Sequence, residues 1–105
     1  LAALPALAAL ADRMDCRCAA TFIMPGSDER AFAENVAWHV ERLRPAAAIL
    51  ADRNVRLGLE FCGPESFRRP FAFPFLWTAP RALDLARAIG VDNVGLLLVA
   101  WHVYA

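Results

Sequence analysis

Short apolar runs alternate with longer amphipathic segments along the chain. Three of these runs are rich in strand-forming residues and are bounded by turn or helix-ending residues: 18–24, 56–62 and 93–100. None of them alternates cleanly between apolar and polar positions, which is typical of parallel strands that are covered on both faces. We therefore predict three buried parallel strands that are separated by helices.

The segment after the first run has the periodicity of a long helix. Ser27 and Asp28 are expected to be its N-caps, because their side chains can accept hydrogen bonds from the first free N–H groups. The apolar positions that follow are spaced by three or four residues and define one helix face: Phe32, Val36, Val40, Leu43, Ala47 and Leu50. Pro45 is expected to kink or split this helix near Arg44, and Asn54 to close it in a left-handed conformation.

A second helix is predicted between the second and third runs. Thr78 is expected to cap it, with Pro80 in its first turn and Gly90 at its end. Its apolar stripe consists of Leu83, Ala86 and Ile89. Residues 65–77 before it are predicted to be a loop. Residues 1–11 are predicted to be an Ala/Leu helix rather than a secretion signal, because no basic residue precedes them.

This order of elements fits either an open doubly wound sheet or a (β/α)8 barrel. No glycine-rich dinucleotide or Walker motif supports the first fold. In the second strand, Gly58, Glu60 and Cys62 share one face, and the apolar side chains of Leu57, Leu59 and Phe61 share the other. A small residue followed by a carboxylate is typical of a barrel interior that opens into a site. We predict an α/β fold, a fragment of a (β/α)8 TIM barrel, forming one partial domain over residues 1–105.

Composition and charge exclude several classes of protein. The chain has 105 residues and is 59% hydrophobic, which excludes a disordered tail. The formal net charge is +0, and the 11 residues counted as lysine plus arginine are all arginine, so we do not expect a nucleic-acid partner. No uncharged apolar run approaches the ~20 residues that span a bilayer, so no membrane partner is expected. Cys16, Cys18 and Cys62 form neither a closed disulfide set nor a zinc site, which indicates the reducing cytoplasm.

Glu60 is the most informative candidate for chemistry. A carboxylate within the apolar second strand must be desolvated, paired or bound to a metal. It is either the partner of an arginine in a structural ion pair, or a metal ligand or general base at the barrel mouth. His102 follows the third strand and is either a packed, hydrogen-bonded histidine or part of a site. His39 lies within the long helix and is expected to be a helix-surface or interface residue.

The predicted loop offers a second set of candidates. Arginine side chains there could meet a phosphate or carboxylate of a substrate, but a solvated loop is the favoured interpretation. The charged residues are Glu65, Arg68 and Arg69. Aromatic side chains alternate along the same loop and are expected to form a lid or a contact with a neighbour: Phe71, Phe73, Phe75 and Trp77.

Two stretches resemble a known family. Leu-Gly-Leu-Glu-Phe-Cys-Gly-Pro at 57–64 and Asn-Val-Gly-Leu-Leu-Leu-Val-Ala-Trp-His at 93–102 are similar to the sugar phosphate isomerase/epimerase family, the xylose isomerase-like TIM barrels. Residues 24–27 and 41–45 fit the same family. The resemblance covers nearly the whole chain and implies strands four to six of an eight-stranded barrel. It also implies a divalent metal ion (Mn, Mg or Zn), held by carboxylates and a histidine from the last four strands.

The resemblance assigns roles to individual residues. Glu60 matches the fifth-strand glutamate that binds the metal, and it is the candidate for both ligand and catalytic base. His102 matches a histidine that contacts the substrate. Val99 stands where the family has an aspartate ligand, so one expected ligand is missing. The function implied is a metal-dependent isomerase or epimerase that transfers a proton next to a carbonyl through an enediolate. Its substrate would be a small sugar or sugar phosphate.

Two other functions stay open. The first is a non-catalytic sugar-binding or scaffold barrel that has lost its metal ligand at Val99. The second is a DNA repair enzyme of the endonuclease IV type, which shares this barrel but against which the neutral charge weighs. Three strands of a barrel leave two open edges, so residues 1–105 alone are expected to aggregate, oligomerise or remain molten. A homo-oligomer is therefore a further expectation.

Overall fold

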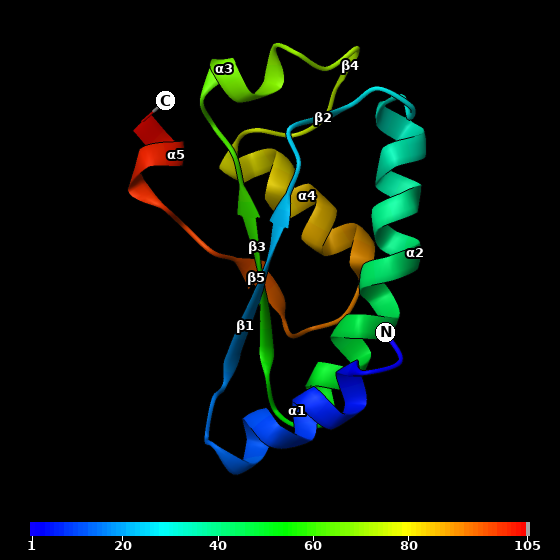
Figure 1. The fold of residues 1–105 in the computed structure, drawn as a ribbon, viewed down its shortest axis with the longest axis vertical. Coiled ribbons are helices and arrows are strands. Elements are labelled where there is room, and N and C mark those ends of the chain that lie inside the picture. The colour runs from blue at the N-terminus through cyan, green and yellow to red at the C-terminus, as the bar shows by residue number, and fades with distance from the viewer. Residues whose placement is uncertain (105) are drawn as a thin grey trace.

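Three parallel strands form the centre of the molecule. The computed structural model describes residues 1–104. The elements are α1 (Leu4–Arg13), β1 (Cys18–Ile23), β2 (Gly26–Ser27), α2 (Phe32–Ala51), β3 (Arg56–Phe61), α3 (Glu65–Arg68), β4 (Phe73–Pro74), α4 (Ala79–Ile89), β5 (Val94–Leu96) and α5 (Ala100–Tyr104). The main sheet has the order β1-β3-β5, and both pairs are parallel (Figure 1). Each strand is joined to the next by a segment that contains a long helix, as parallel pairing requires. The predicted βαβαβ arrangement is confirmed.

The two faces of β3 differ in the way that the sequence predicts. Leu57, Leu59 and Phe61 are at most 5% exposed and belong to the apolar core beneath α2 and α4. Burial of such a side chain contributes about 1.5–3 kcal/mol to the free energy of unfolding. Gly58 and Glu60 lie on the opposite face and are only partly buried. The sheet therefore packs on helices with one face and leaves its polar positions accessible on the other.

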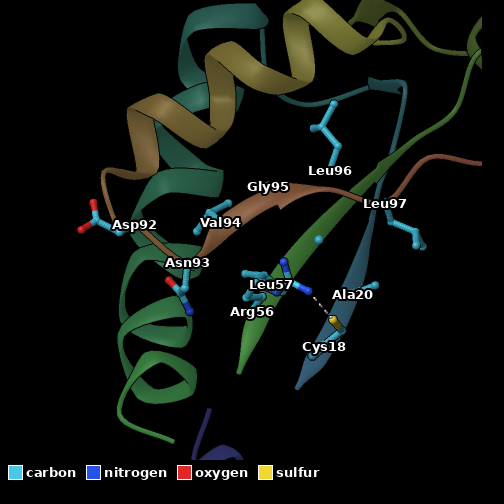
Figure 2. A pocket seen from close by; sticks show the side chains of 12 residues that line it. Cys18, Ala20, Arg56, Leu57, Asp92, Asn93, Val94, Gly95, Leu96 and Leu97 are labelled. Carbon is cyan, nitrogen blue, oxygen red and sulfur yellow. Dashed lines mark hydrogen bonds between the residues drawn. The ribbon is translucent and has the colours of Figure 1, made fainter. Parts of the chain in front are cut away.

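One cavity lies away from the carboxyl end of β3. This cavity of about 590 Å³ is bounded by β5 and by the first residues of β1 and β3 (Figure 2). Arg56 lines it, and its guanidinium donates a hydrogen bond to the Cys18 sulfur on the neighbouring strand at 3.5 Å. Glu60 is absent from its lining. This cavity thus belongs to the amino-terminal half of the sheet.

The start of α2 differs from the prediction. Its N-cap is Ala31, and neither Ser27 nor Asp28 caps it. The Ser27 hydroxyl instead accepts hydrogen bonds from two backbone N–H groups of the turn after β2, both at 3.1 Å. Asp28 Oδ1 accepts one from the backbone N–H of Ala72 at 2.9 Å. Because Ser27 lies in β2, which pairs with β4, and Asp28 binds the backbone just before β4, the chain is not yet helical at these two residues and the helix starts later.

The long helix continues without a break through Pro45, so the predicted split near Arg44 is wrong. The Arg44 guanidinium donates hydrogen bonds to the carbonyl oxygens of Ile89 and Ala88, at 2.8 and 3.0 Å. These bonds hold α2 against the end of α4, and this packing outweighs the backbone hydrogen bond that proline removes. Asn54 follows the helix with a φ of 54°, as predicted.

The second helix has the predicted ends and two of the three predicted buried positions. Thr78 is its N-cap, Pro80 lies in the first turn, and Gly90 ends it in the left-handed conformation with a φ of 75°. Leu83 is 38% exposed, whereas Leu85 is 2% exposed and packs in the core. Ala86 and Ile89 of the predicted stripe are buried as expected, and Leu85 rather than Leu83 completes the buried side of the helix.

Two predicted segments have different bounds in the structure. The third strand ends at Leu96 rather than at residue 100, after which the Leu97 N–H still donates to the Leu59 carbonyl at 3.0 Å. A short helix, α5, begins at Ala100 instead. The predicted loop over 65–77 contains the short helix α3 and the strand β4.

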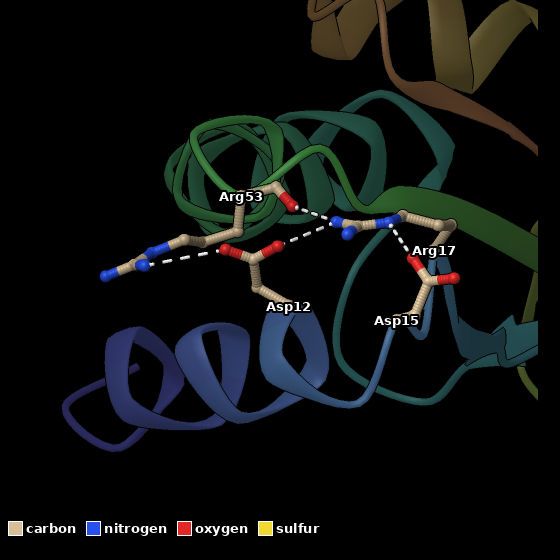
Figure 3. A network of polar contacts seen from close by, with 4 residues as sticks. All are labelled: Asp12, Asp15, Arg17 and Arg53. Atoms are coloured by element: carbon tan, nitrogen blue, oxygen red, sulfur yellow. Dashed lines mark hydrogen bonds and ion pairs between the residues drawn. The ribbon is translucent and has the colours of Figure 1, made fainter.

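A network of charges ties α1 to the rest of the molecule (Figure 3). The Arg17 guanidinium donates to Asp12, to Asp15 and to the backbone carbonyl of Arg53, at 2.9, 3.0 and 2.9 Å. The guanidinium of Arg53 lies 3.7 Å from Asp12. These side chains are largely exposed, so each pair stabilises the fold little and mainly positions α1. The predicted N-terminal helix is confirmed, although it covers residues 4–13 rather than 1–11.

Candidate functional site

A carboxylate and an imidazole meet at the carboxyl end of the sheet. Glu60 Oε1 lies 3.4 Å from Nε2 of His102. The side chain of Glu60 is 26% exposed and that of His102 is 7% exposed. Glu60 comes from β3 and His102 from α5, so the fold brings together the two site residues that the sequence selects. Their roles in catalysis, metal binding and substrate binding remain predictions.

His102 is held from several sides. Its backbone N–H donates to the carbonyl of Val99 at 3.0 Å, which starts α5. A Cβ at Gly63 would run into the carbonyl of His102, so α5 can approach the end of β3 only because residue 63 is glycine. The ring also packs near Phe22 and Trp101, with centroids 6.4 and 5.2 Å away. These contacts fix the imidazole beside Glu60.

The structural ion pair between Glu60 and an arginine is not found. Within residues 1–104, the basic side chain paired with Glu60 is His102. Burial raises the pKa of the Cys62 thiol, and the nearby Glu60 carboxylate adds to this effect. Both effects disfavour the thiolate form of Cys62, which is the reactive form of a cysteine. All three cysteines are free, as predicted.

His39 is buried, and the prediction of a helix-surface residue is wrong. It is 8% exposed, and its ring stacks on Phe75 with centroids 4.8 Å apart. Its Nδ1 lies 2.7 Å from the carbonyl oxygen of Asn35. The segment before α4 folds back over α2, and it covers this histidine. Burial lowers the pKa of His39, and nearby arginines add to the effect against the opposing hydrogen bond to Asn35.

The aromatic residues before α4 do not act as one lid. Phe75 is 2% exposed and belongs to the core, whereas Phe73 is 40% exposed. The alternation therefore reflects an extended segment with one side chain buried against α2. Phe73 and Phe75 differ because Phe75 packs against a helix that is distant in the sequence. The spacing of the aromatic residues along the chain does not reveal this contact.

The charged residues of the same region also differ in their surroundings. Arg69 forms an ion pair with Glu65 at 3.5 Å, and both side chains are more than 60% exposed. Arg68 lies with its guanidinium 4.2 Å above the centre of the Trp77 ring, and its Nε is buried without a hydrogen-bond partner. Arg68 is thus the residue of this set that faces into the molecule.

The described residues supply only part of a metal site. Glu60 offers a partly buried carboxylate without an arginine partner, and such an oxygen donor suits a divalent cation. No cluster of three or more histidine, cysteine or acidic residues that could hold a metal occurs in residues 1–104. Val99 has no donor in its side chain, and its carbonyl already accepts hydrogen bonds within α5. Glu60 fits as one ligand, and a complete site needs others that these residues do not provide.

Three parallel strands in chain order, with helices between them and a carboxylate at the carboxyl end, define the wall of an α/β barrel. A family model described as a xylose isomerase-like TIM barrel matches residues 1–105. The chain therefore belongs to the xylose isomerase-like TIM barrel family. None of the helices in residues 1–104 combines the length and hydropathy needed to span a bilayer.

Solved structures agree with this assignment. A xylose isomerase domain protein from Alicyclobacillus acidocaldarius subsp. acidocaldarius is 31% identical, with a TM-score of 0.85 over 93% of this chain and 34% of that chain. The IolI protein, solved with a bound zinc atom, is 19% identical, with a TM-score of 0.74 over 97% of this chain and 34% of that chain. The second likeness concerns the fold alone. The chain spans about a third of each of these structures, and no curated protein matches it significantly.

Proposed function

We propose that residues 1–105 belong to a metal-dependent isomerase or epimerase of sugars or sugar phosphates. The observation that carries this proposal is the contact of 3.4 Å between Glu60 and His102 at the carboxyl end of β3. Barrels of this class hold their active sites at that end of the strands. The family is in keeping with this reaction class.

Glu60 has two tasks in this reaction. It would be one ligand of a divalent cation (Mn, Mg or Zn), whose chemistry is to stabilise negative charge on the sugar oxygens as a Lewis acid. Its carboxylate also accepts the proton from the carbon next to the sugar carbonyl, which leaves an enediolate. Return of the proton to the former carbonyl carbon, with transfer of the hydroxyl proton to the former carbonyl oxygen, completes an isomerisation. Delivery of a proton to the opposite face of the same carbon, by an acid on that face, completes an epimerisation.

His102 orients the substrate. Its Nδ1 is buried and has no hydrogen-bond partner within residues 1–104. A substrate hydroxyl at that nitrogen would satisfy it and fix the sugar relative to Glu60. Because the ring is held by α5, this hydrogen bond needs little rearrangement of the protein.

The test is turnover by the full-length protein with aldoses, ketoses and their phosphates in the presence of manganese. We expect Glu60→Gln to lower kcat by about 10²–10⁴, because the variant lacks the base while it keeps the shape of the side chain. Glu65→Gln is the matched control, since that carboxylate is exposed and bound to Arg69. Turnover by Glu60→Gln at the level of the control would disprove the assignment.

One observation favours a second function. Val99 and the lack of a third donor within residues 1–104 fit a sugar-binding or scaffold barrel without chemistry. Such a protein would bind a sugar without converting it, and restoration of the ligand by Val99→Asp would add metal binding without turnover. We further propose that the protein works in the cytoplasm, since its three cysteines are free.

A further inference from the structure

A second cavity, of about 340 Å³, lies next to the Glu60–His102 pair. Its wall is formed by the end of β3, by α3, by the first turn of α4 and by α5. Arg68, Trp77, Thr78 and His102 are among its lining residues. Its size is at the lower end of the range for small-molecule sites, about 300–1,000 Å³.

Arg68 brings an unpaired positive charge to this cavity. Its Nε is buried without a partner, and it forms no ion pair with any other residue in the described part of the chain. The ring of Trp77, 4.2 Å from the guanidinium, holds the side chain in place. A buried donor without an acceptor costs free energy unless a ligand supplies one.

His102 gives a second and independent signal at the same cavity. Its side chain is 7% exposed, and its Nδ1 is also buried without a partner. The other ring nitrogen, Nε2, faces Glu60. One imidazole ring therefore connects this cavity to the carboxylate of the proposed active site.

The first turn of α4 adds positive potential. The helix has 11 residues and no acidic residue in its first turn, and the Thr78 side chain makes no capping hydrogen bond. Free N–H groups and the helix dipole make such an end favourable for an anion. Pro80 contributes no N–H, so the charge of Arg68 is the main attraction.

We propose that this cavity binds a phosphate group, with Arg68 as the counter-ion, the start of α4 beside it, and His102 Nδ1 accepting a hydrogen bond from a neighbouring hydroxyl. The planar guanidinium can donate two parallel hydrogen bonds to phosphate oxygens. A phosphate next to a hydroxyl defines the ligand class as a small phosphorylated sugar or polyol. That identity rests on the proposed function, whereas the binding of phosphate itself does not.

The test measures binding by calorimetry on the full-length protein. The ligands are inorganic phosphate, a pentose 5-phosphate, the same pentose without phosphate, and the corresponding sugar acid. We expect the phosphorylated sugar to bind most tightly. Arg68→Met is expected to weaken it by about ten- to hundredfold, as for loss of a charged hydrogen bond. Arg68→Lys keeps the positive charge but lacks the two parallel donors of the guanidinium, so this variant should lose part of the affinity. Arg69→Met is the matched control and should change nothing.

Three outcomes would overturn the phosphate subsite. Equal affinity for the sugar with and without phosphate excludes it. Equal losses of affinity in the Arg68 and Arg69 variants would show that only the overall positive charge matters. Tighter binding of the sugar acid assigns the cavity to a carboxylate. If inorganic phosphate binds as tightly as the phosphorylated sugar, the phosphate subsite is supported and the sugar phosphate is overturned as its ligand. Failure here is distinct from failure of the proposed function, because Glu60→Gln affects turnover and leaves phosphate binding intact.

Discussion

The backbone carbonyl of His102 occupies the space that a Cβ on Gly63 would need. This close approach brings α5 onto the end of β3 and places the imidazole beside Glu60. We expect Gly63→Ala to push α5 away and to lower stability by about 1–3 kcal/mol, because backbone atoms cannot move as side chains do. Hydrogen exchange of α5 and denaturant unfolding of the full-length protein measure the two effects.

The matched control is Gly95→Ala. A Cβ at Gly95 meets no atom of residues 1–104 within 4 Å. Protection of α5 should therefore stay at the wild-type level in this variant. Equal protection of α5 in Gly63→Ala would show that the glycine does not determine its position.

Val99→Asp should raise the affinity for divalent cations. Aspartate adds a hard oxygen donor where the family resemblance expects a ligand, and such donors suit Mn and Mg. Titration of the full-length protein with manganese measures the gain, and Val103→Asp is the control because that side chain is 56% exposed. Equal affinities in the two variants would contradict the proposed position of the ligand. A gain in affinity without turnover would favour the non-catalytic barrel.

His39 should make stability depend on pH. Its pKa is lowered in the folded state, chiefly by burial, so the unfolded chain binds a proton more readily. The free energy of unfolding is expected to fall as the pH drops below the unfolded value of about 6.5, until the folded histidine is also protonated. Unfolding of wild type and His39→Phe at about pH 7.5 and pH 5.5 tests this. His39→Phe keeps an aromatic ring against Phe75 but has no titratable group there. It should therefore lose the part of the pH dependence of stability that His39 causes. An identical fall in both proteins would exclude His39 as the cause.

Residues 1–105 on their own should not form a stable monomer. β1 and β5 are edges of the sheet, and Phe22, Leu97 and Leu98 are 46%, 39% and 62% exposed. Unpaired edges and exposed apolar side chains favour association. Analytical ultracentrifugation and thermal unfolding measure this directly. A monodisperse monomer with a sharp cooperative transition would contradict the expectation.

The sequence was sufficient for those parts of the fold that depend on local pattern. The apolar runs predicted the three strands, and Gly90 and Asn54 predicted two helix ends, because a left-handed residue is required there. The local pattern predicted the wrong structure where contacts with distant segments determine the conformation. Ser27 and Asp28 bind turn and loop backbone instead of capping α2, and Pro45 is accommodated by contacts with α4.

The residues of the candidate site also divide into those that the local sequence identifies and those whose positions depend on distant contacts. Glu60 was found because a carboxylate in an apolar strand requires a partner. The meeting of Glu60 with His102 depends on α5, which begins where the sequence suggested a continuing strand. The inward position of Arg68 could not be separated from that of Arg69 by sequence, because it depends on stacking against Trp77. The burial of His39 likewise depends on a distant phenylalanine.

The central claim is that Glu60 is a metal ligand in a sugar isomerase or epimerase. Elemental analysis of the purified full-length protein, after incubation with manganese, magnesium or zinc, tests it most directly. The claim predicts about one divalent ion per chain in the wild type and its loss in Glu60→Ala. The Glu65→Ala control should keep the ion. A wild-type protein without metal, or a Glu60→Ala variant with the same metal content, would contradict the claim.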